Sequence, residues 1–203
     1  MMSREKMNTR ERILNSAWAL LEADAVSEVR MSDIAADAGI SRQALYLHFP
    51  NRAELLVATT RYIDEVKDVD GRLAASRSAA SGRERLTAFI DMWCNYIPEV
   101  YGVLKAIMAM KDTDAEAAIA WNDRMQAVRH GCEAAVKALA KDGDLTPKLS
   151  TRKATDTLWM LLSVRNWEQL TIECGWSQKQ YISTIRDLVH QALIAEGNTK
   201  AGK

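Results

Sequence analysis

Residues that interrupt or cross-link a chain are scarce in this sequence. Its 203 residues include three prolines, nine glycines and three cysteines. Because few positions force the backbone to turn, long helices can form with little interruption. The cysteines are odd in number, far apart and without metal-ligand spacing, so we expect neither a disulfide framework nor a metal site.

Long apolar runs are also missing. No stretch approaches membrane-spanning length, and the first residues do not have the apolar run of a signal peptide. Hydrophobic residues still make up 48% of the chain, an ordinary value for a folded protein. We therefore expect a cytoplasmic protein that is neither secreted nor inserted in a membrane.

Catalytic motifs are the third absence. The sequence has no glycine-rich phosphate loop, no G-x-S-x-G, no H-E-x-x-H and no paired His/Cys cluster. A helical enzyme is one alternative, but no motif supports it. We expect no enzyme activity, no cofactor and no metal ion.

Helical periodicity is the dominant positive signal. Apolar residues recur three and four positions apart through most of the chain, and no segment alternates as a strand does. We expect an all-α fold of about nine helices, the first of them capped by Thr9. A loop is expected at 70–82 and a helix end at Pro98. Residues 158–171 are nearly apolar all round, which predicts burial on most faces.

Two short helices are expected on either side of Gly39. This glycine, which takes a left-handed conformation cheaply, ends the first helix, and Ser41 caps the second, Arg42 to His48. A tight turn between two short helices allows the second to enter the major groove of DNA. The residues expected to hold this pair together are Ile34, Ala35, Ala38, Gly39, Ile40, Leu45 and Phe49.

Polar residues project from the second helix. Arg42 can read a guanine edge and Gln43 an adenine edge. Tyr46 can reach a phosphate or a thymine methyl, and His48 also points outward. The spacing alone fits a plain helical hairpin with a polar surface equally well.

The residue identities favour DNA binding. The segment I-A-A-D-A-G-I-S-R-Q-A-L-Y-L-H-F-P-N-R-A-E-L, residues 34–55, closely resembles the N-terminal domain of the TetR (tetracycline repressor) family. That family's pattern is I-A-x-x-A-G-V-S-x-x-x-L-Y-x-H-F, then a short cap and K-x-x-L. The match is dense over about 20 positions, and Thr9 to Leu21 also resembles that family's first helix. The strong resemblance covers about a quarter of the chain, and the remainder resembles the family in layout and length.

The resemblance implies a division of the chain. A three-helix DNA-binding domain would occupy residues 1–55, with its helix-turn-helix at about 30–49. A linking helix at about 51–69 would lead into a larger helical ligand-binding and dimerisation domain at 56–203, with a disordered tail at about 197–203. The DNA contacts implied by the resemblance are Ser32, Arg42, Gln43, Ala44, Tyr46, His48 and Arg52.

Three residues depart from the family pattern. Arg30 stands where a capping Thr is usual, so either Ser32 takes over the cap or Arg30 adds a phosphate contact. Ala25 stands where a turn glycine is common. Arg52 replaces the usual Lys, an exchange that a phosphate contact tolerates.

Charge gives this domain little general attraction to DNA. The chain has 27 basic and 27 acidic residues, and residues 1–55 hold seven basic against eight acidic ones. We therefore expect modest non-specific affinity, with specific binding depending on base contacts and on dimerisation.

Bulky apolar residues gather beyond residue 70, where five of the six tryptophans lie. Such side chains can line a pocket for a small molecule or fill the core between helices. Core filling fits any single one better, but the resemblance implies that some face a cavity. The expected lining residues are Trp93, Tyr96, Met108, Trp121, Met125 and Trp159.

The last two predicted helices, about 152–174 and 178–195, are unusually apolar. In the resembling family they pair with a partner's copies as a four-helix bundle. We expect an isologous homodimer that holds two recognition helices about 34–36 Å apart. The expected interface residues are Trp167, Tyr181, Ile185 and Leu188.

The sequence with its resemblance thus predicts a DNA-binding transcriptional regulator. It would be a homodimeric repressor released from double-stranded operator DNA by a small, largely apolar ligand. The alternative is a DNA-binding regulator without a small-molecule effector, controlled by protein partners. A filled core without a cavity would favour that alternative.

Overall fold

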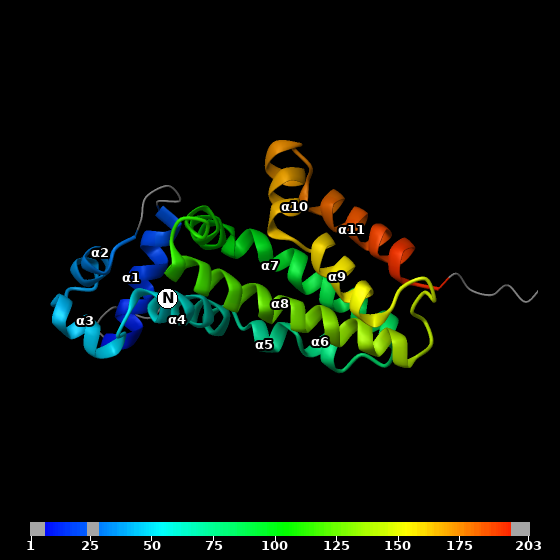
Figure 1. Cartoon of the computed structure of the whole chain (residues 1–203), viewed down its shortest axis with the longest axis horizontal. Coiled ribbons are helices and arrows are strands. Elements are labelled where there is room, and N and C mark those ends of the chain that lie inside the picture. Colours follow the sequence, from blue (N-terminus) through cyan, green and yellow to red (C-terminus); the bar gives the residue numbers. More distant parts are fainter. Residues whose placement is uncertain (1–6, 24–28, 196–203) are drawn as a thin grey trace, which may run out of the picture. The chain divides into compact units, whose positions relative to one another are not determined.

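The computed structural model describes residues 7–23 and 29–195. Within these ranges every regular element is a helix, and the only β pairing is one isolated antiparallel bridge between Leu145 and Ile194. The all-α prediction is confirmed, whereas the predicted tail at 197–203 lies outside the described residues. The elements are α1 (Thr9–Ala23), α2 (Met31–Asp37), α3 (Arg42–His48), α4 (Arg52–Val66), α5 (Val69–Arg72), α6 (Ala74–Arg77), α7 (Gly82–Met110), α8 (Ala115–Lys141), α9 (Thr151–Leu161), α10 (Val164–Glu168), the π-helix η2 (Gln169–Glu173) and α11 (Gln178–Leu193) (Figure 1).

The chain divides into two compact units. The first comprises Met1–Asp70 and Glu99–Gln126, and the second Gly71–Pro98 and Ala127–Lys203. Both α7 and α8 therefore contribute residues to each unit. The division predicted at residue 55 separates a DNA-binding domain from a ligand-binding and dimerisation domain by their functions, and it stays a prediction.

Side-chain caps determine where the short helices of the first unit begin. The Ser41 hydroxyl accepts a hydrogen bond from the Ala44 N–H at 3.1 Å, and the Asn51 side chain accepts one from the Glu54 N–H at 2.8 Å. Each bond satisfies a backbone donor that the first turn leaves free. Helices α3 and α4 therefore begin where the sequence predicts.

The cap of α1 is one residue earlier than predicted. Asn8 accepts the Glu11 N–H at 2.9 Å, and the Glu11 carboxylate accepts the Asn8 N–H at 3.0 Å. This reciprocal pair satisfies two donors at once, so Thr9 is the first residue of the helix rather than its cap.

The turn between α2 and α3 depends on Gly39. Its φ is +66°, a conformation that costs other residues about 1–2 kcal/mol. The Gly39 N–H donates to the Ala36 carbonyl at 3.1 Å, and the Ile40 N–H donates to the Ala35 carbonyl at 3.0 Å. The last carbonyls of α2 are thereby satisfied, as at other glycine-terminated helices.

A small apolar core joins the helices of this domain. Helix α2 lies beside α3, and α1 packs against α2 and α4 (Figure 1). Of the predicted pair-holding residues, Ile40 is half-buried at the edge of this core and Gly39 is exposed in the turn; the buried ones are Ile34, Ala35, Ala38, Leu45 and Phe49.

Helix α7 contradicts the predicted end at Pro98, because it continues through the proline to Met110. A proline inside a helix removes a hydrogen bond and crowds the preceding turn, at a cost of about 3 kcal/mol. Ile97 and Val100 are buried on either side of it. Full burial of such side chains contributes about 1.5–3 kcal/mol each, so packing outweighs the local defect.

Two further predictions are wrong, one for the loop at 70–82 and one for the helix at about 152–174. The expected loop at 70–82 contains the short helices α5 and α6. The helix predicted at about 152–174 is interrupted, because α9 ends at Leu161 and the Ser163 hydroxyl caps α10 by accepting the Arg165 N–H at 3.2 Å. A serine that bonds the local backbone competes with helix continuation.

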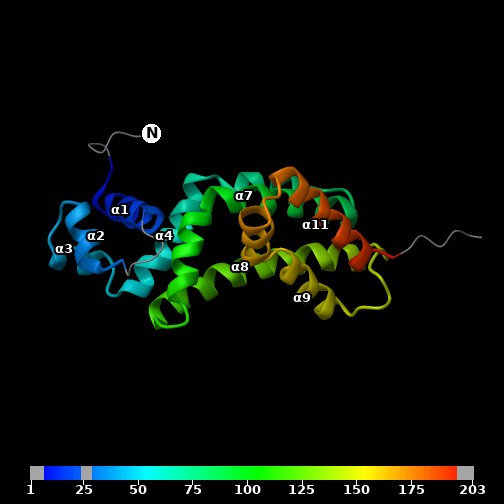
Figure 2. The ribbon, with the colours of Figure 1, turned by 90° about the horizontal axis from the view of Figure 1, so that it is seen from above.

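The second unit buries one face of its last helix. Helix α11 lies alongside α9 (Figure 2). Its inward stripe follows the three-and-four spacing of a helix face and consists of Tyr181, Ile185, Val189 and Leu193. The Arg186 side chain, on another face, pairs with Asp91 of α7 at 2.5 Å.

Replacing Gly39 tests the turn. A Cβ at this position would meet no atom within 4 Å, so Gly39→Ala changes backbone energy alone. We expect Gly39→Ala to lower the free energy of unfolding by about 1 kcal/mol, measured by urea denaturation. Gly39→Asn should cost less, because Asn adopts the left-handed conformation more readily. Equal costs for the two variants would contradict this explanation.

Candidate nucleic-acid interface

The outer surface of α3 presents most of the predicted DNA contacts. Arg42, Gln43, Tyr46 and His48 are exposed, while Leu45 points into the core. Ala44 is half-buried, and its N–H is already bonded to Ser41. The short helix therefore offers a polar face that a DNA groove could reach, and the individual contacts stay predictions.

Arg42 and Tyr46 act as a pair on that surface. The Arg42 guanidinium donates to the Tyr46 hydroxyl at 3.4 Å, and its carbon lies 5.6 Å from the ring centroid. Residues four apart are neighbours on a helix surface. The hydroxyl also raises the pKa of Arg42 above its ordinary value, and the contact partly orients the guanidinium.

Leu47 is the residue of this surface that the sequence prediction missed. It is 84% exposed, on a helix whose other exposed residues are polar or aromatic. The helical periodicity could have indicated this exposure, because Leu45 and Phe49 face the core and residue 47 lies between them.

The start of α2 does not use the predicted cap. The Arg30 N–H donates to the Asp33 carboxylate at 3.3 Å, and the Ser32 hydroxyl donates to the same group at 3.4 Å. Asp33 therefore satisfies the free donor, and the prediction that Ser32 takes over the cap is wrong. Arg30 and Ser32 are both exposed, so a phosphate contact from either stays a prediction.

The structure corrects the role predicted for Arg52. Its side chain is 6% exposed, and its Nε donates to the Val29 carbonyl at 2.7 Å. Another guanidinium nitrogen forms an ion pair with Asp114, and the third lies 3.3 Å from the Met110 sulfur. The predicted phosphate contact is wrong, because this guanidinium is buried and engaged inside the first unit.

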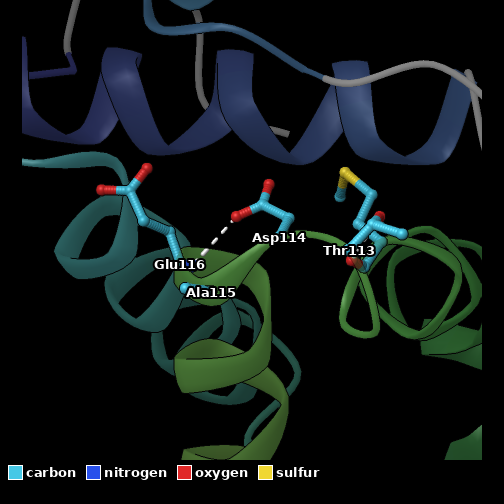
Figure 3. Close-up of a pocket in the computed structure, with 5 residues that line it drawn as sticks. Thr113, Asp114, Ala115 and Glu116 are labelled. Carbon is cyan, nitrogen blue, oxygen red and sulfur yellow. Dashed lines mark hydrogen bonds between the residues drawn. The ribbon is translucent and has the colours of Figure 1, made fainter.

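The partner carboxylate sits at the beginning of α8. The Glu116 N–H donates to one Asp114 oxygen at 2.9 Å (Figure 3). The Ala117 N–H donates to the same oxygen at 3.1 Å, and the other oxygen accepts the bond from Arg52. Burial raises the pKa of Asp114, but the Arg52 guanidinium and these two N–H groups outweigh it and lower the pKa below its ordinary value.

A second bond joins the same two segments. The Glu116 carboxylate accepts the Ala53 N–H at 3.4 Å. The first turn of α4 is thus held to the first turn of α8 by Arg52 and Ala53. Because Asn51 and α3 directly precede α4, this connection fixes the frame from which α3 projects.

Ion pairs continue along α4. Arg61 pairs with Asp123 at 2.6 Å, and Asp64 pairs with Arg124, both partners lying on α8. The Arg61 pair is largely exposed and contributes little. The Arg124 pair is largely buried, so together with Arg52 it ties both ends of α4 to α8.

A pocket of about 430 Å³ lies beside the α7–α8 turn (Figure 3). Its lining residues are Met110, Thr113, Asp114, Ala115 and Glu116. The two carboxylates are engaged by α4 and by backbone donors, so the pocket is not a cation site. In the part of the chain that the structure describes, no group of three potential ligands could hold a metal, and no helix is long and apolar enough to cross a membrane.

The predicted ligand-pocket residues are divided between the two units. Met108, Trp121 and Met125 belong to the first, and Trp93, Tyr96 and Trp159 to the second. Four are buried; Trp121 and Trp159 are half-buried. Their role as a cavity lining stays a prediction.

Trp93 and Tyr96 fill the core of the second unit. The Trp93 indole N–H donates to the Leu162 carbonyl at 2.8 Å, and the two rings lie 6.1 Å apart. The Arg72 guanidinium stacks 5.2 Å from the Tyr96 centroid. These contacts give both aromatic residues internal partners, as core residues have.

Three of the four predicted interface residues are wrong. Trp167, Tyr181 and Ile185 are buried inside the second unit, and the Trp167 indole donates to Gln178 at 2.8 Å. Leu188, 42% exposed, can still reach a partner. The apolar stripe of α11 belongs to the core of its own chain, so the apolar side chains left on the surface of this hairpin are Met160, Ile172 and Leu188.

Comparison with known proteins supports the predicted family of the helix-turn-helix segment. Residues 13–59 match the family model for bacterial regulatory proteins of the tetR family, the segment that contains α2, α3 and the Gly39 turn. Residues 13–59, which contain the helix-turn-helix, therefore belong to the N-terminal domain of the TetR family, as the sequence predicted.

Curated relatives match this chain over part of its length. The nucleoid occlusion factor SlmA of Idiomarina loihiensis is 33% identical over 64 residues, covering 32% of this chain and 33% of the relative. The HTH-type transcriptional regulator EthR of Mycobacterium tuberculosis is 30% identical over 121 residues, covering 56% of this chain and 53% of the relative. The chain thus spans between a third and about half the length of these curated relatives.

A solved structure extends the likeness to the whole fold. The transcriptional regulator FadR from Bacillus subtilis, in complex with stearoyl-CoA, matches with a TM-score of 0.71 over 88% of this chain and 96% of that one. The sequences are 13% identical, so this likeness shows that the two chains share a fold.

The Arg52–Asp114 pair predicts a pH-dependent cost. Asp114→Asn leaves the buried guanidinium without its counter-charge, so we expect a loss of about 2 kcal/mol at neutral pH. Because the folded pKa of Asp114 is lowered, its contribution is present above the ordinary carboxyl pKa and is lost as pH falls through the folded value. The difference between wild type and variant in urea unfolding should therefore shrink as the pH falls below the ordinary carboxyl pKa.

Asp123→Asn is the matched control. It removes the exposed pair with Arg61, so we expect a change within about 0.5 kcal/mol. A cost of Asp114→Asn that is small, or that stays constant over the whole pH range, would contradict the role given to the buried pair.

Proposed function

We propose that this protein is a TetR-family, DNA-binding transcriptional regulator that reads double-stranded operator DNA with α3. The observation that carries the proposal is the exposed face of α3, on which Arg42, Gln43 and Tyr46 lie together. A capped start at Ser41 and a glycine turn before it hold that face outward. Arginine and glutamine are the side chains that best distinguish guanine and adenine in the major groove.

The proposal includes dimerisation, because a single DNA-binding domain has little electrostatic attraction to DNA. Residues 1–55 are slightly acidic, so two copies must combine their base contacts. Met160, Ile172 and Leu188 expose apolar surface on the α9–α11 hairpin. An isologous pairing of these surfaces would cover all three in both copies.

The finer proposal is repression relieved by a small, largely apolar ligand. The FadR structure with stearoyl-CoA supports it, since a protein of this fold holds a ligand with a long apolar chain. Met108, Trp121 and Met125 in the first unit and Trp159 in the second are the remaining candidates for ligand contacts. DNA and ligand affinities must then change each other by the same factor.

The Arg52–Asp114 pair supplies a route for that coupling within the first unit. A displacement of the α7–α8 turn would act on the first turn of α4 through Arg52 and Ala53. Asn51 and α3 lie immediately before it in the chain. A ligand would then shift the balance between two positions of α4, to the extent that it binds one better.

A regulator without a small-molecule effector is the second candidate. The packing of Trp93 and Tyr96 favours it, because both fill the core of the second unit with internal partners. The two candidates differ in one measurement. Binding of stearoyl-CoA or another long-chain acyl-CoA that lowers operator affinity supports the ligand-responsive repressor, and tight binding without any effect on operator affinity contradicts it.

Arg42→Ala tests the proposed reading helix. The full-length protein first selects a duplex from a random DNA pool. We expect Arg42→Ala to weaken binding to that duplex by about 1–3 kcal/mol, the value of a bidentate base contact. Lys148→Ala is the control, since it removes one exposed positive charge in the second unit. Equal losses for both variants would show a general charge effect instead of base reading.

Ile172→Asp tests the proposed pairing surface. Ile172 is 58% exposed, and we expect a charge there to convert a dimer to a monomer in sedimentation equilibrium, because an unpaired charge would be buried at the interface. Ile119→Asp, at a similarly exposed isoleucine of α8 (53%), should leave the mass unchanged. A wild-type protein that sediments as a monomer would refute the dimer.

A further inference from the structure

Leu47 is exposed to a degree that the fold does not explain. Among the large hydrophobic residues that the structure describes, its exposed fraction of 84% is the highest. Leu45 and Phe49, on either side of it, are buried and carry the packing of α3. Leu47 therefore adds nothing to the core, and its apolar surface is left in water in the free protein.

The position of Leu47 on α3 aligns it with a proposed base reader. Residues four apart lie next to each other on a helix surface. Arg42 and Tyr46 form one such pair, which their contacts show directly. Gln43 and Leu47 form the neighbouring pair, one residue further along, and both are exposed. The reading face thus has a polar amide and an apolar side chain one turn apart.

The major groove has an apolar group that suits this arrangement. The thymine C5-methyl is the group there that apolar side chains contact, and glutamine bonds the N6 and N7 atoms of adenine. Adenine and the thymine of the same or the next base pair lie close enough for side chains one helical turn apart. A leucine beside a glutamine therefore complements A·T pairs better than G·C pairs, which have no methyl group and cannot form the same two bonds with an amide.

We propose that Leu47 is a specificity-determining residue that packs on a thymine methyl group of the operator, beside an adenine read by Gln43. This inference rests on the proposed function, because it requires α3 to lie in the major groove. It goes beyond the proposed function by assigning a thymine contact to Leu47, which is not one of the polar residues expected to contact bases. The operator half-site should accordingly contain at least one A·T pair facing the centre of α3.

Deoxyuridine isolates the methyl group. It pairs with adenine and keeps every hydrogen-bonding atom of thymine, but carries hydrogen in place of the methyl. The probe is the duplex that the full-length protein selects from a random pool, with each thymine replaced in turn by deoxyuridine. At the position that Leu47 contacts, we expect the replacement to weaken wild-type binding about fourfold in each half-site, the value of burying one methyl group.

Variants of Leu47 connect the loss to this side chain. Leu47→Ala should bind the thymine duplex more weakly and should lose its sensitivity to deoxyuridine at that one position. Leu47→Met keeps an apolar side chain and should keep the sensitivity. Val66→Ala, at an exposed valine of α4, is the control and should reproduce the wild-type pattern. Because Leu47 is outside the core, all three variants should unfold at the wild-type urea concentration.

The outcomes separate the two levels of the proposal. If the wild-type protein selects no duplex from the pool, the proposed function fails and the inference fails with it. If a duplex is selected and Arg42→Ala weakens its binding, the proposed function stands. Should Leu47→Ala then respond to every deoxyuridine as the wild type does, Leu47 faces no thymine methyl and the inference alone is overturned.

Discussion

The buried ion pair between Arg52 and Asp114 is the contact on which the arrangement of the first unit depends. A guanidinium taken out of water is costly unless a carboxylate and further hydrogen bonds compensate it, and here Asp114 and the Val29 carbonyl do so. Asp114 is itself held by two backbone N–H groups at the start of α8. Neither partner can move alone without leaving a buried charge unpaired. The beginning of α4 is thereby fixed to the α7–α8 turn.

Short helices acquire a definite orientation from this fixed point. Helix α3 has seven residues, too few to be stable by itself in water. It is held by Leu45 and Phe49 beneath it, by the Ser41 cap at one end and by the Asn51 cap of α4 beyond the other. A reading face that must meet base edges needs such support, because small errors in position cost much of the binding energy. The proposed regulation follows from the same arrangement, since the segment that stabilises α3 also joins it to α8.

Local chemistry explains which features could be predicted from the sequence. Gly39, Ser41 and Asn51 act on residues within three or four positions, so turns and caps were readable directly. Arg52 was misread because its partner lies 62 residues away, and no local pattern distinguishes a buried guanidinium from an exposed one. The interface prediction failed for a related reason. Periodicity shows that α11 has an apolar stripe, but not whether the stripe faces its own core, as Tyr181 and Ile185 do, or a partner.

The most direct test of the account is hydrogen–deuterium exchange of the full-length protein, measured by mass spectrometry with and without the duplex it selects. Docking of α3 in the major groove predicts slower exchange on DNA addition at the amides of residues 31–49. The amides of α6 and of the loop before α9 should exchange at the same rate in both states. Slowing confined to other segments, with 31–49 unchanged at saturating duplex, would contradict the claim that α3 is the reading helix.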